Sequence, residues 1–137
     1  MKIQIDHINL SVINLTASES FYSQTFGFEK VESGHSISNS ERRPWSILKK
    51  DASMLCLYEN PKLKTSTDKD DGFAKIYHFG IRLEGIQTQE WEEKIAHEKI
   101  PIEDGEAVQY PHSTSWYVID PSGHKIEVSY WPQGVKF

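Results

Sequence analysis

Apolar positions along the chain follow two patterns, one typical of strands and the other of amphipathic helices. Ile3–Val12 and Ile76–Leu83 are apolar throughout or alternate between apolar and polar residues, which predicts a strand at each place. A helical pattern follows each strand, at 17–26 and at 89–99, and three short apolar stretches follow each helix. We predict those later strands at 28–33, 45–49 and 54–59, and again at 102–108, 115–119 and 125–131.

Local signals mark where the predicted helices begin and end. Asn14 or Thr16 is a plausible N-cap for the first helix, and Gly27 is its expected C-terminal stop. Thr88 precedes the second helix, and Pro101 closes it. The sequence Asp-Pro-Ser-Gly at 120–123 predicts a hairpin turn between the last two strands.

The two halves of the chain are related by an offset of 71 residues. Without any gap, this offset places His7 on His78, Trp45 on Trp116 and Cys56 on Glu127. Such a register indicates a diverged duplication of one βαβββ module. We therefore predict a single α+β domain with module one at 1–61, a linker at 62–74, module two at 75–132 and a tail at 133–137.

The repeat also indicates a group of candidate functional residues. Strand side chains alternate between faces, so Glu127 faces away from the apolar Ile126 and Val128. Together with the symmetric His7 and His78 it makes two imidazoles and one carboxylate, a set that suits Fe(II), Mn(II), Zn(II) or Ni(II) and leaves positions open for substrate. The alternative is that the histidines are satisfied in the core and Glu127 faces solvent.

Composition narrows the class of partner. Of 137 residues, 37% are hydrophobic, the formal net charge is −5 and the basic residues are scattered, so nucleic acid is not an expected partner. The single Cys56 excludes an intrachain disulfide. Neither a signal peptide nor an apolar run of membrane-spanning length is visible, so we expect a cytoplasmic protein without a membrane partner.

The chain resembles the vicinal oxygen chelate superfamily. The resemblance covers nearly the whole chain and rests on the βαβββ duplication, on "DHINLSV" at 6–12 with "SFYSQTFGFE" at 20–29, and on "SWYVIDPSGHKIEVSYW" at 115–131. That superfamily contains glyoxalase I, methylmalonyl-CoA epimerase, extradiol ring-cleaving dioxygenases, fosfomycin-resistance proteins and metal-free bleomycin-binding proteins. It implies a curved sheet in each module, a deep cleft and a divalent metal bound by His7, His78 and Glu127.

The resemblance also separates the possible reactions. Glyoxalase I and the epimerase carry Glu or Gln at a fourth ligand position, where this register places Cys56; Glu59 is near but has the opposite strand parity. The segment from His112 to Glu127 is similar to the end of extradiol dioxygenases. This similarity implies that Tyr117 donates a hydrogen bond to the substrate and that His112 moves protons.

From these observations we expect a metal-dependent enzyme on a small molecule that chelates through two adjacent oxygens. An extradiol-type dioxygenase with Fe(II) is the first choice. A glyoxalase-type lyase or a fosfomycin-type thiol transferase is the alternative, with Mn(II), Zn(II) or Ni(II). A metal-free small-molecule binding protein is the alternative of another class. We expect a homodimer, and the site could be built within one chain or across two.

Overall fold

The chain folds into two compact units. The computed structural model describes residues 1–64, 66, 68, 70–72 and 75–135, and the units are Met1–Lys64 and Thr65–Phe137, called unit 1 and unit 2 below. The predicted linker at 62–74 and the predicted tail at 133–137 each include residues that lie outside the described ones. No helix in the described part of the chain has the length and apolar character needed to span a bilayer.

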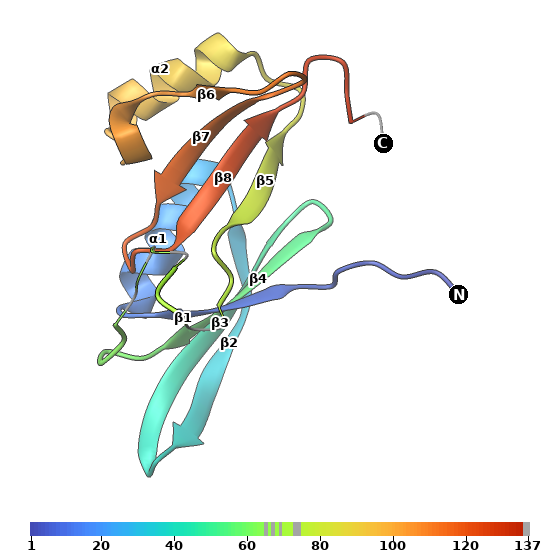
Figure 1. The fold of residues 1–137 in the computed structure, drawn as a ribbon. Helices are drawn as coiled ribbons and strands as arrows, with labels where there is room; N and C mark the ends of the chain where they lie inside the picture. The colour runs from blue at the N-terminus through green and yellow to red at the C-terminus, as the bar shows by residue number, and fades with distance from the viewer. Residues whose placement is uncertain (65, 67, 69, 73–74, 136–137) are drawn as a thin grey trace. The chain divides into compact units, whose positions relative to one another are not determined.

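Each unit contains the predicted βαβββ order (Figure 1). Unit 1 consists of β1 (Ile8–Val12), α1 (Leu15–Phe26), β2 (Glu29–Ser38), β3 (Glu41–Lys50) and β4 (Ser53–Glu59). Unit 2 consists of β5 (Phe79–Leu83), α2 (Thr88–Glu98), the 3₁₀ turn η1 (Glu103–Gly105), β6 (Val108–Gln109), β7 (Thr114–Ile119) and β8 (Lys125–Tyr130). The α+β fold with two βαβββ modules is therefore confirmed.

Both sheets have the same topology. The strand orders are β1-β4-β3-β2 and β5-β8-β7-β6, with the first strand of each unit parallel to its last strand and the remaining neighbours antiparallel. Ile8 lies opposite Leu55 in unit 1, and Phe79 lies opposite Ile126 in unit 2. These two pairs are related by the offset of 71, so the repeat is correct for the parallel strand pair.

One face of each sheet packs into a small core. In β4 the alternate residues Leu55 and Leu57 are buried while Cys56 between them is only half buried; in β8 the same holds for Ile126, Val128 and Glu127. The buried apolar residues are Leu10, Val12, Leu15, Tyr22, Phe28, Leu48, Leu55 and Leu57 in unit 1, and Phe79, Trp91, Ile100, Trp116, Val118, Ile126 and Val128 in unit 2. Position 56 and position 127 thus face away from the core, as the alternation predicted.

The ends of α1 follow the predicted chemistry, whereas α2 begins one residue earlier than predicted, at Thr88, with Gln87 as its N-cap. Asn14, and not Thr16, caps α1: its Oδ1 accepts from the Ala17 N–H at 2.8 Å, and Gly27 ends the helix in the left-handed region with φ 75°. Glu59 adds a second N-terminal contact, since its Oε2 accepts from the Leu15 N–H at 2.9 Å. In α2 the Glu90 side chain accepts from the Gln87 N–H at 3.5 Å, which closes a capping box.

The turn at 120–123 also forms as predicted. The Gly123 N–H donates to the Asp120 carbonyl at 3.0 Å. The buried Asp120 carboxylate accepts from the Ser122 N–H at 2.9 Å and from the His124 N–H at 2.8 Å. The aspartate therefore satisfies turn amides that would otherwise be buried without partners, and the turn sets where β8 begins.

Three predicted strands are shorter in the structure, whereas β2 and β3 are longer than the predicted 28–33 and 45–49. β1 begins at Ile8 instead of Ile3, and β5 begins at Phe79 instead of Ile76. In unit 1 the parallel register would pair Ile3 and Ile5 with residues that come before Ser53, the first residue of β4. These two isoleucines therefore have no partner in β4. The stretch predicted as a strand at 102–108 keeps only β6 and an isolated bridge, because η1 interrupts it with Asp104 at φ 59°.

The gapless repeat is wrong in β3 and β7. Leu57 lies opposite Ser46, whereas its counterpart Val128 lies opposite Trp116, so Trp116 is equivalent to Ser46 and not to Trp45. The turn between Lys50 and Ser53 has an even number of residues, and the turn between Ile119 and Lys125 has an odd number. This difference shifts the pairing by one residue and turns Trp45 to the face opposite the core.

Trp45 packs over Gly34, its partner across β2 and β3, and this contact predicts a stability effect. A Cβ added at Gly34 would lie 2.5 Å from Cζ2 of Trp45. Gly34→Ala should therefore lower the free energy of unfolding by about 1–3 kcal/mol, because the indole must move off the sheet. Urea denaturation followed by far-UV circular dichroism measures it.

Gly80→Ala is the matched control, since an added Cβ there meets only the Glu127 carbonyl oxygen at 3.8 Å. This variant should be neutral, or more stable by up to about 1 kcal/mol, through reduced entropy of the unfolded chain. Equal effects of the two substitutions would show that the Gly34–Trp45 contact does not restrict the strand.

Candidate functional site

Two of the predicted metal ligands lie together in unit 2. His78 is the residue before β5, and Glu127 lies in β8 on the face opposite the core. His78 Nε2 is 3.0 Å from Glu127 Oε2, and the two side chains are 31% and 25% exposed, so the pair is reachable from solvent. The second carboxylate oxygen is also engaged: Ser115 Oγ donates to Glu127 Oε1 at 2.7 Å. The carboxylate is thereby fixed at both oxygens.

Two tyrosine rings hold the imidazole of His78. The ring of Tyr77 has its centroid 5.3 Å from that of His78, and the ring of Tyr117 meets it edge to face at 5.7 Å. Nδ1 of His78 is buried and has no hydrogen-bond partner among the described residues. The imidazole is therefore oriented by its contact with Glu127 and by the two aromatic neighbours.

Tyr117 lies directly opposite Glu127 across β7 and β8. Its hydroxyl is 2.7 Å from the hydroxyl of Tyr110, and either oxygen can be the donor. Burial raises the pKa of the Tyr117 phenol; its hydrogen bond with Tyr110 and the charge of Glu127 raise it further. Tyr117 is consequently a phenol, not a phenolate, at neutral pH, and it can donate a hydrogen bond.

Lys125 is a site residue that the sequence analysis missed. It lies two residues before Glu127 on the same face of β8, yet its side chain is only 3% exposed. Its Nζ contacts Glu103 Oε1 at 2.9 Å, donates to the Tyr77 hydroxyl at 2.9 Å and lies 4.4 Å from the Tyr77 ring centroid. Burial lowers the pKa of Lys125, but its hydrogen bonds with Tyr77 and Glu103 outweigh burial and raise it, so the amine stays charged.

Strand alternation carried the signal for two of the missed residues. Lys125 and Ser115 each lie two positions from a predicted site residue, Glu127 and Tyr117 respectively, so they had to share that face. Tyr110 had no such signal, because it lies just beyond β6, where a turn closed by the Tyr110 N–H and the Ser113 carbonyl at 2.8 Å determines its place.

The third predicted ligand, His7, lies in unit 1 just before β1. Its side chain is 45% exposed, and its Nδ1 contacts Asp6 Oδ2 at 2.8 Å. A carboxylate at Nδ1 favours the tautomer that carries its proton there, which leaves a lone pair on Nε2. This is the arrangement that a metal-binding histidine needs.

Cys56 and Glu59 occupy different faces of β4. Cys56 lies opposite Asn9 of β1, as Glu127 lies opposite Gly80 of β5, so Cys56 is the structural counterpart of Glu127. Partial burial and the nearby charge of Asp6 raise the pKa of the Cys56 thiol. Glu59 has the parity of the core residues and is engaged at the N-terminus of α1. Unit 1 thus presents a protonated thiol where unit 2 presents a carboxylate.

His112 does not join the His78–Glu127 pair. It lies in the exposed bend between β6 and β7, and it makes no hydrogen bond or ion pair with the described residues. Its predicted role therefore has no contact in the structure to support it, although the bend leaves its imidazole open to solvent.

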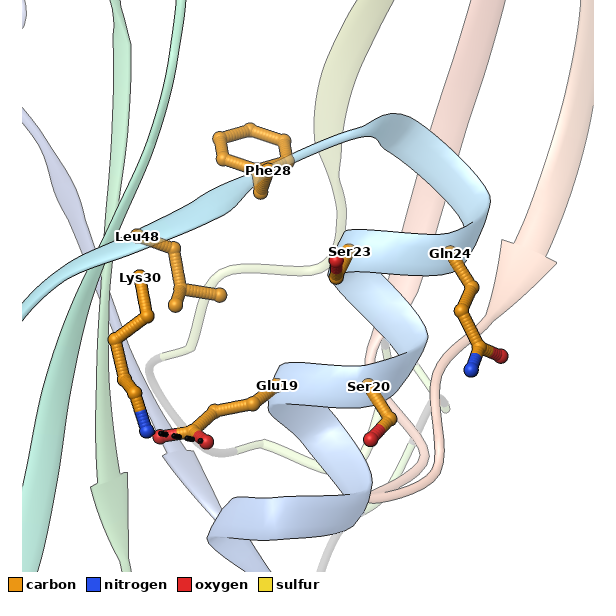
Figure 2. A pocket seen from close by; sticks show the side chains of 7 residues that line it. All are labelled: Glu19, Ser20, Ser23, Gln24, Phe28, Lys30 and Leu48. Carbon is orange, nitrogen blue, oxygen red and sulfur yellow. Dashed lines mark hydrogen bonds and ion pairs between the residues drawn. The ribbon is translucent and has the colours of Figure 1, made fainter.

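A surface pocket in unit 1 lies apart from these residues. It has a volume of about 270 Å³ and lies between α1 and the strands β2 and β3, with Phe28 and Leu48 as its apolar lining. An ion pair between Glu19 Oε2 and Lys30 Nζ, at 3.1 Å, closes one side (Figure 2). The remaining lining residues are Ser20, Ser23 and Gln24. None of the predicted site residues lines this pocket, so it is not the candidate site.

The donors present suit a divalent metal. Within the described residues no group of three His, Cys, Asp or Glu side chains converges on one point. The pair in unit 2 nevertheless has a suitable separation: two ligand atoms at adjacent corners of an octahedron with bonds of about 2.1 Å are about 3.0 Å apart. His78 Nε2 and Glu127 Oε2 are separated by 3.0 Å. The separation of this imidazole and this carboxylate is therefore compatible with such an ion, which would take the place of the proton that Glu127 favours on His78 Nε2.

Solved structures with the same fold extend over almost the whole chain. A glyoxylase/bleomycin resistance protein/dioxygenase domain from Frankia sp. EAN1pec matches with TM-score 0.77 and 14% identity, covering 98% of this chain and 96% of that one. The fosfomycin resistance protein FosX from Listeria monocytogenes matches with TM-score 0.71 and 16% identity, covering 97% of each chain. Lactoylglutathione lyase from Agrobacterium tumefaciens matches with TM-score 0.62 and 22% identity, covering 93% and 92%.

Sequence comparison agrees with the fold. No curated protein sequence matches this chain. The family model for the Glyoxalase/Bleomycin resistance protein/Dioxygenase superfamily matches residues 4–128. These residues include β1, β4 and β5, and β8 as far as Val128, with the Glu127 position. The chain belongs to the Glyoxalase/Bleomycin resistance protein/Dioxygenase superfamily, which is the vicinal oxygen chelate superfamily.

Proposed function

We propose that this protein is a metal-dependent enzyme that acts on a small molecule through two adjacent oxygens, with ring-cleaving oxygenation of a catechol as the favoured reaction. One observation carries the proposal: a solvent-accessible His78–Glu127 pair, 3.0 Å apart, lies beside the phenol of Tyr117. An imidazole, a carboxylate and a neutral hydrogen-bond donor then face the same place. These are the groups that a chelating diol requires.

His78 Nε2 and Glu127 Oε2 are the proposed ligands from unit 2, and His7 Nε2 is the proposed ligand from unit 1. An Fe(II) ion, when bound, would supply electrons to dioxygen and positive charge to a chelated diol. Ser115 fixes the outer oxygen of Glu127, so that Oε2 keeps its direction toward His78. Asp6 does the same for His7 by fixing its tautomer.

The favoured reaction balances without an external reductant. Dioxygen adds to a catechol, the ring bond beside the diol breaks, and both oxygen atoms end in the ring-opened product. In this scheme the Tyr117 hydroxyl donates to a substrate oxygen and stabilises the negative charge that develops on it. His112, which is open to solvent in the bend before β7, is the proposed group for proton exchange.

The residue at position 56 argues against an isomerase that removes a carbon-bound proton. Such a reaction needs a carboxylate or a comparable base at the substrate. Cys56 has a raised thiol pKa and stays protonated near neutral pH, and Glu59 is engaged at the helix α1. Neither Cys56 nor Glu59 is therefore a suitable base.

A lyase or a fosfomycin-type transferase is the second candidate. The observation that favours it is the fold match to FosX, which covers 97% of both chains, and a further structure of that FosX contains Mn(II) and sulfate. In this reading Mn(II) takes the place of Fe(II), and the same three ligands bind it. A metal-free binding protein for flat aromatic molecules is the candidate of another class, and a homodimer is the assembly that we propose for each of these functions.

Oxygen consumption with a catechol tests the favoured reaction. Protein loaded anaerobically with Fe(II) should consume oxygen on mixing with at least one member of a catechol panel. Tyr117→Phe should lower kcat roughly 100-fold and change KM little, because the hydrogen bond is worth most in the transition state. An oxygen electrode and the absorbance of ring-opened products follow the reaction.

A second panel distinguishes the alternatives. Mn(II), Zn(II) and Ni(II) protein is mixed with epoxides and with thiol adducts of aldehydes. Turnover there, without oxygen uptake in the first panel, would replace the oxygenase by the transferase or lyase. No reaction in either panel, together with tight binding of an aromatic ligand to metal-free protein, would show that the protein is a small-molecule binding protein.

His78→Ala should weaken Mn(II) or Zn(II) binding by roughly 100-fold or more. Loss of residues that merely support a ligand costs about 10–100-fold, and loss of the ligand itself costs at least as much. The measurement is isothermal titration calorimetry on protein without a histidine tag. His97→Ala, at an exposed position of α2, is the matched control and should bind metal as the wild type does. Unchanged metal affinity in His78→Ala would show that His78 is not a ligand.

Cys56→Ser should change Zn(II) affinity by no more than about threefold. A thiol with a raised pKa contributes little as a ligand, because the thiolate is the form that binds metal. The cost in stability should be at most about 1 kcal/mol, since Cys56 is only half buried. A large drop in affinity without loss of stability would instead make Cys56 a fourth ligand.

A further inference from the structure

We propose that Tyr110 is a positioning residue that directs the hydroxyl of Tyr117 toward the substrate. This inference rests on the proposed function, in which Tyr117 is the hydrogen-bond donor. It adds a residue that no motif indicated, and it assigns a purpose to the 2.7 Å contact between the two phenol oxygens.

The geometry allows the hydrogen bond in two directions. A phenol hydroxyl has one proton to donate, and its oxygen can also accept. If Tyr117 donates to Tyr110, its proton is already used and cannot serve a ligand. If Tyr110 donates to Tyr117, the proton of Tyr117 is free to point elsewhere. An oxygen of a bound ligand therefore selects the second direction.

The surroundings of Tyr110 suit it for the donor role. Its residue is 45% exposed, so water can accept from or donate to its hydroxyl when the direction changes. Its backbone is fixed by the hydrogen bond from the Tyr110 N–H to the Ser113 carbonyl at 2.8 Å. A side-chain contact, from Thr114 Oγ1 to Gln109 Oε1 at 2.9 Å, braces the same turn from the neighbouring residues. These contacts thus fix the backbone position from which the Tyr110 side chain extends, beside β7.

The direction matters for the strength of the hydrogen bond to the ligand. Hydrogen bonds in a chain polarise one another, so donation from Tyr110 makes the Tyr117 proton a better donor. Water could replace Tyr110 only with the added cost of immobilising it. The pair therefore favours a substrate that presents a negatively charged or strongly polarised oxygen to Tyr117, such as a catecholate.

The test is a double-mutant cycle with a ligand that is bound but not turned over. Zn(II)-loaded protein is titrated with 4-nitrocatechol, whose absorbance reports binding. Tyr110→Phe should weaken its affinity about threefold to tenfold and leave the Zn(II) dissociation constant unchanged. Tyr117→Phe should weaken the probe at least as much. Adding Tyr110→Phe to Tyr117→Phe should then weaken probe affinity no further, because Tyr110 acts only through the hydroxyl of Tyr117.

A readout without metal or ligand completes the test. In protein labelled with ¹³C at the phenol carbon Cζ of tyrosine, Tyr110→Phe should shift the signal of Tyr117. An unmoved Tyr117 signal would mean that the hydroxyl pair does not form, and the proposal would fail. It would also fail if Tyr110→Phe left probe affinity unchanged or weakened it equally in both backgrounds.

The same data separate this failure from that of the proposed function. If wild-type Zn(II) protein does not bind the probe, or if Tyr117→Phe leaves its affinity unchanged, the role of Tyr117 is wrong and the role of Tyr110 falls with it. If Tyr117→Phe weakens the probe and Tyr110→Phe does not, only the positioning role is overturned.

Discussion

The parallel pairing of the first and last strands in each unit determines where the chemistry lies. In unit 2 this pairing places Gly80 opposite Glu127, and His78, the residue before β5 and two positions from Gly80, contacts the carboxylate. Successive strand residues face opposite sides, so a shift of one residue would turn Glu127 into the core. The buried Ile126 and Val128 oppose such a shift, because it would expose both of them. Core packing thus holds the polar pair in register.

The same constraint explains how far the sequence could be interpreted. Features set by neighbouring residues were predicted correctly: the Asn14 cap, the Gly27 stop, the Asp120 turn and the alternation around Glu127. Features set by distant partners were not. β1 is shorter than its apolar pattern because β4 has no residues left to pair with Ile3 and Ile5. The proximity of His78 and Glu127 was anticipated from the repeat, and strand alternation could have placed Lys125 and Ser115 on the same face. Tyr110 became visible only when its contact with Tyr117 was known.

The two units have kept one framework and diverged in chemistry. The face of unit 2 that carries Glu127 is polar: Ser115 fixes the carboxylate, and the buried Lys125 pairs with Glu103 and Tyr77. The corresponding face of unit 1 carries Cys56, with Ile47 of β3 opposite it and Trp45 two residues further along that strand. Buried charge requires partners, and unit 2 supplies them within itself. On that face unit 1 has an uncharged thiol beside apolar side chains, and Arg43, further along β3, pairs with Glu41.

The one-residue shift between β3 and β7 has a consequence for how such duplicated proteins diversify. An insertion in an exposed hairpin turn is easily tolerated, yet it can change the turn from an even to an odd length and rotate a whole strand by half a period. Trp45 and Trp116 illustrate the result, since one tryptophan faces outward and the other is in the core. A single turn insertion can therefore exchange the lining of a binding surface in one evolutionary step. Several point substitutions would otherwise be required, and the parallel strand pairs stay in place.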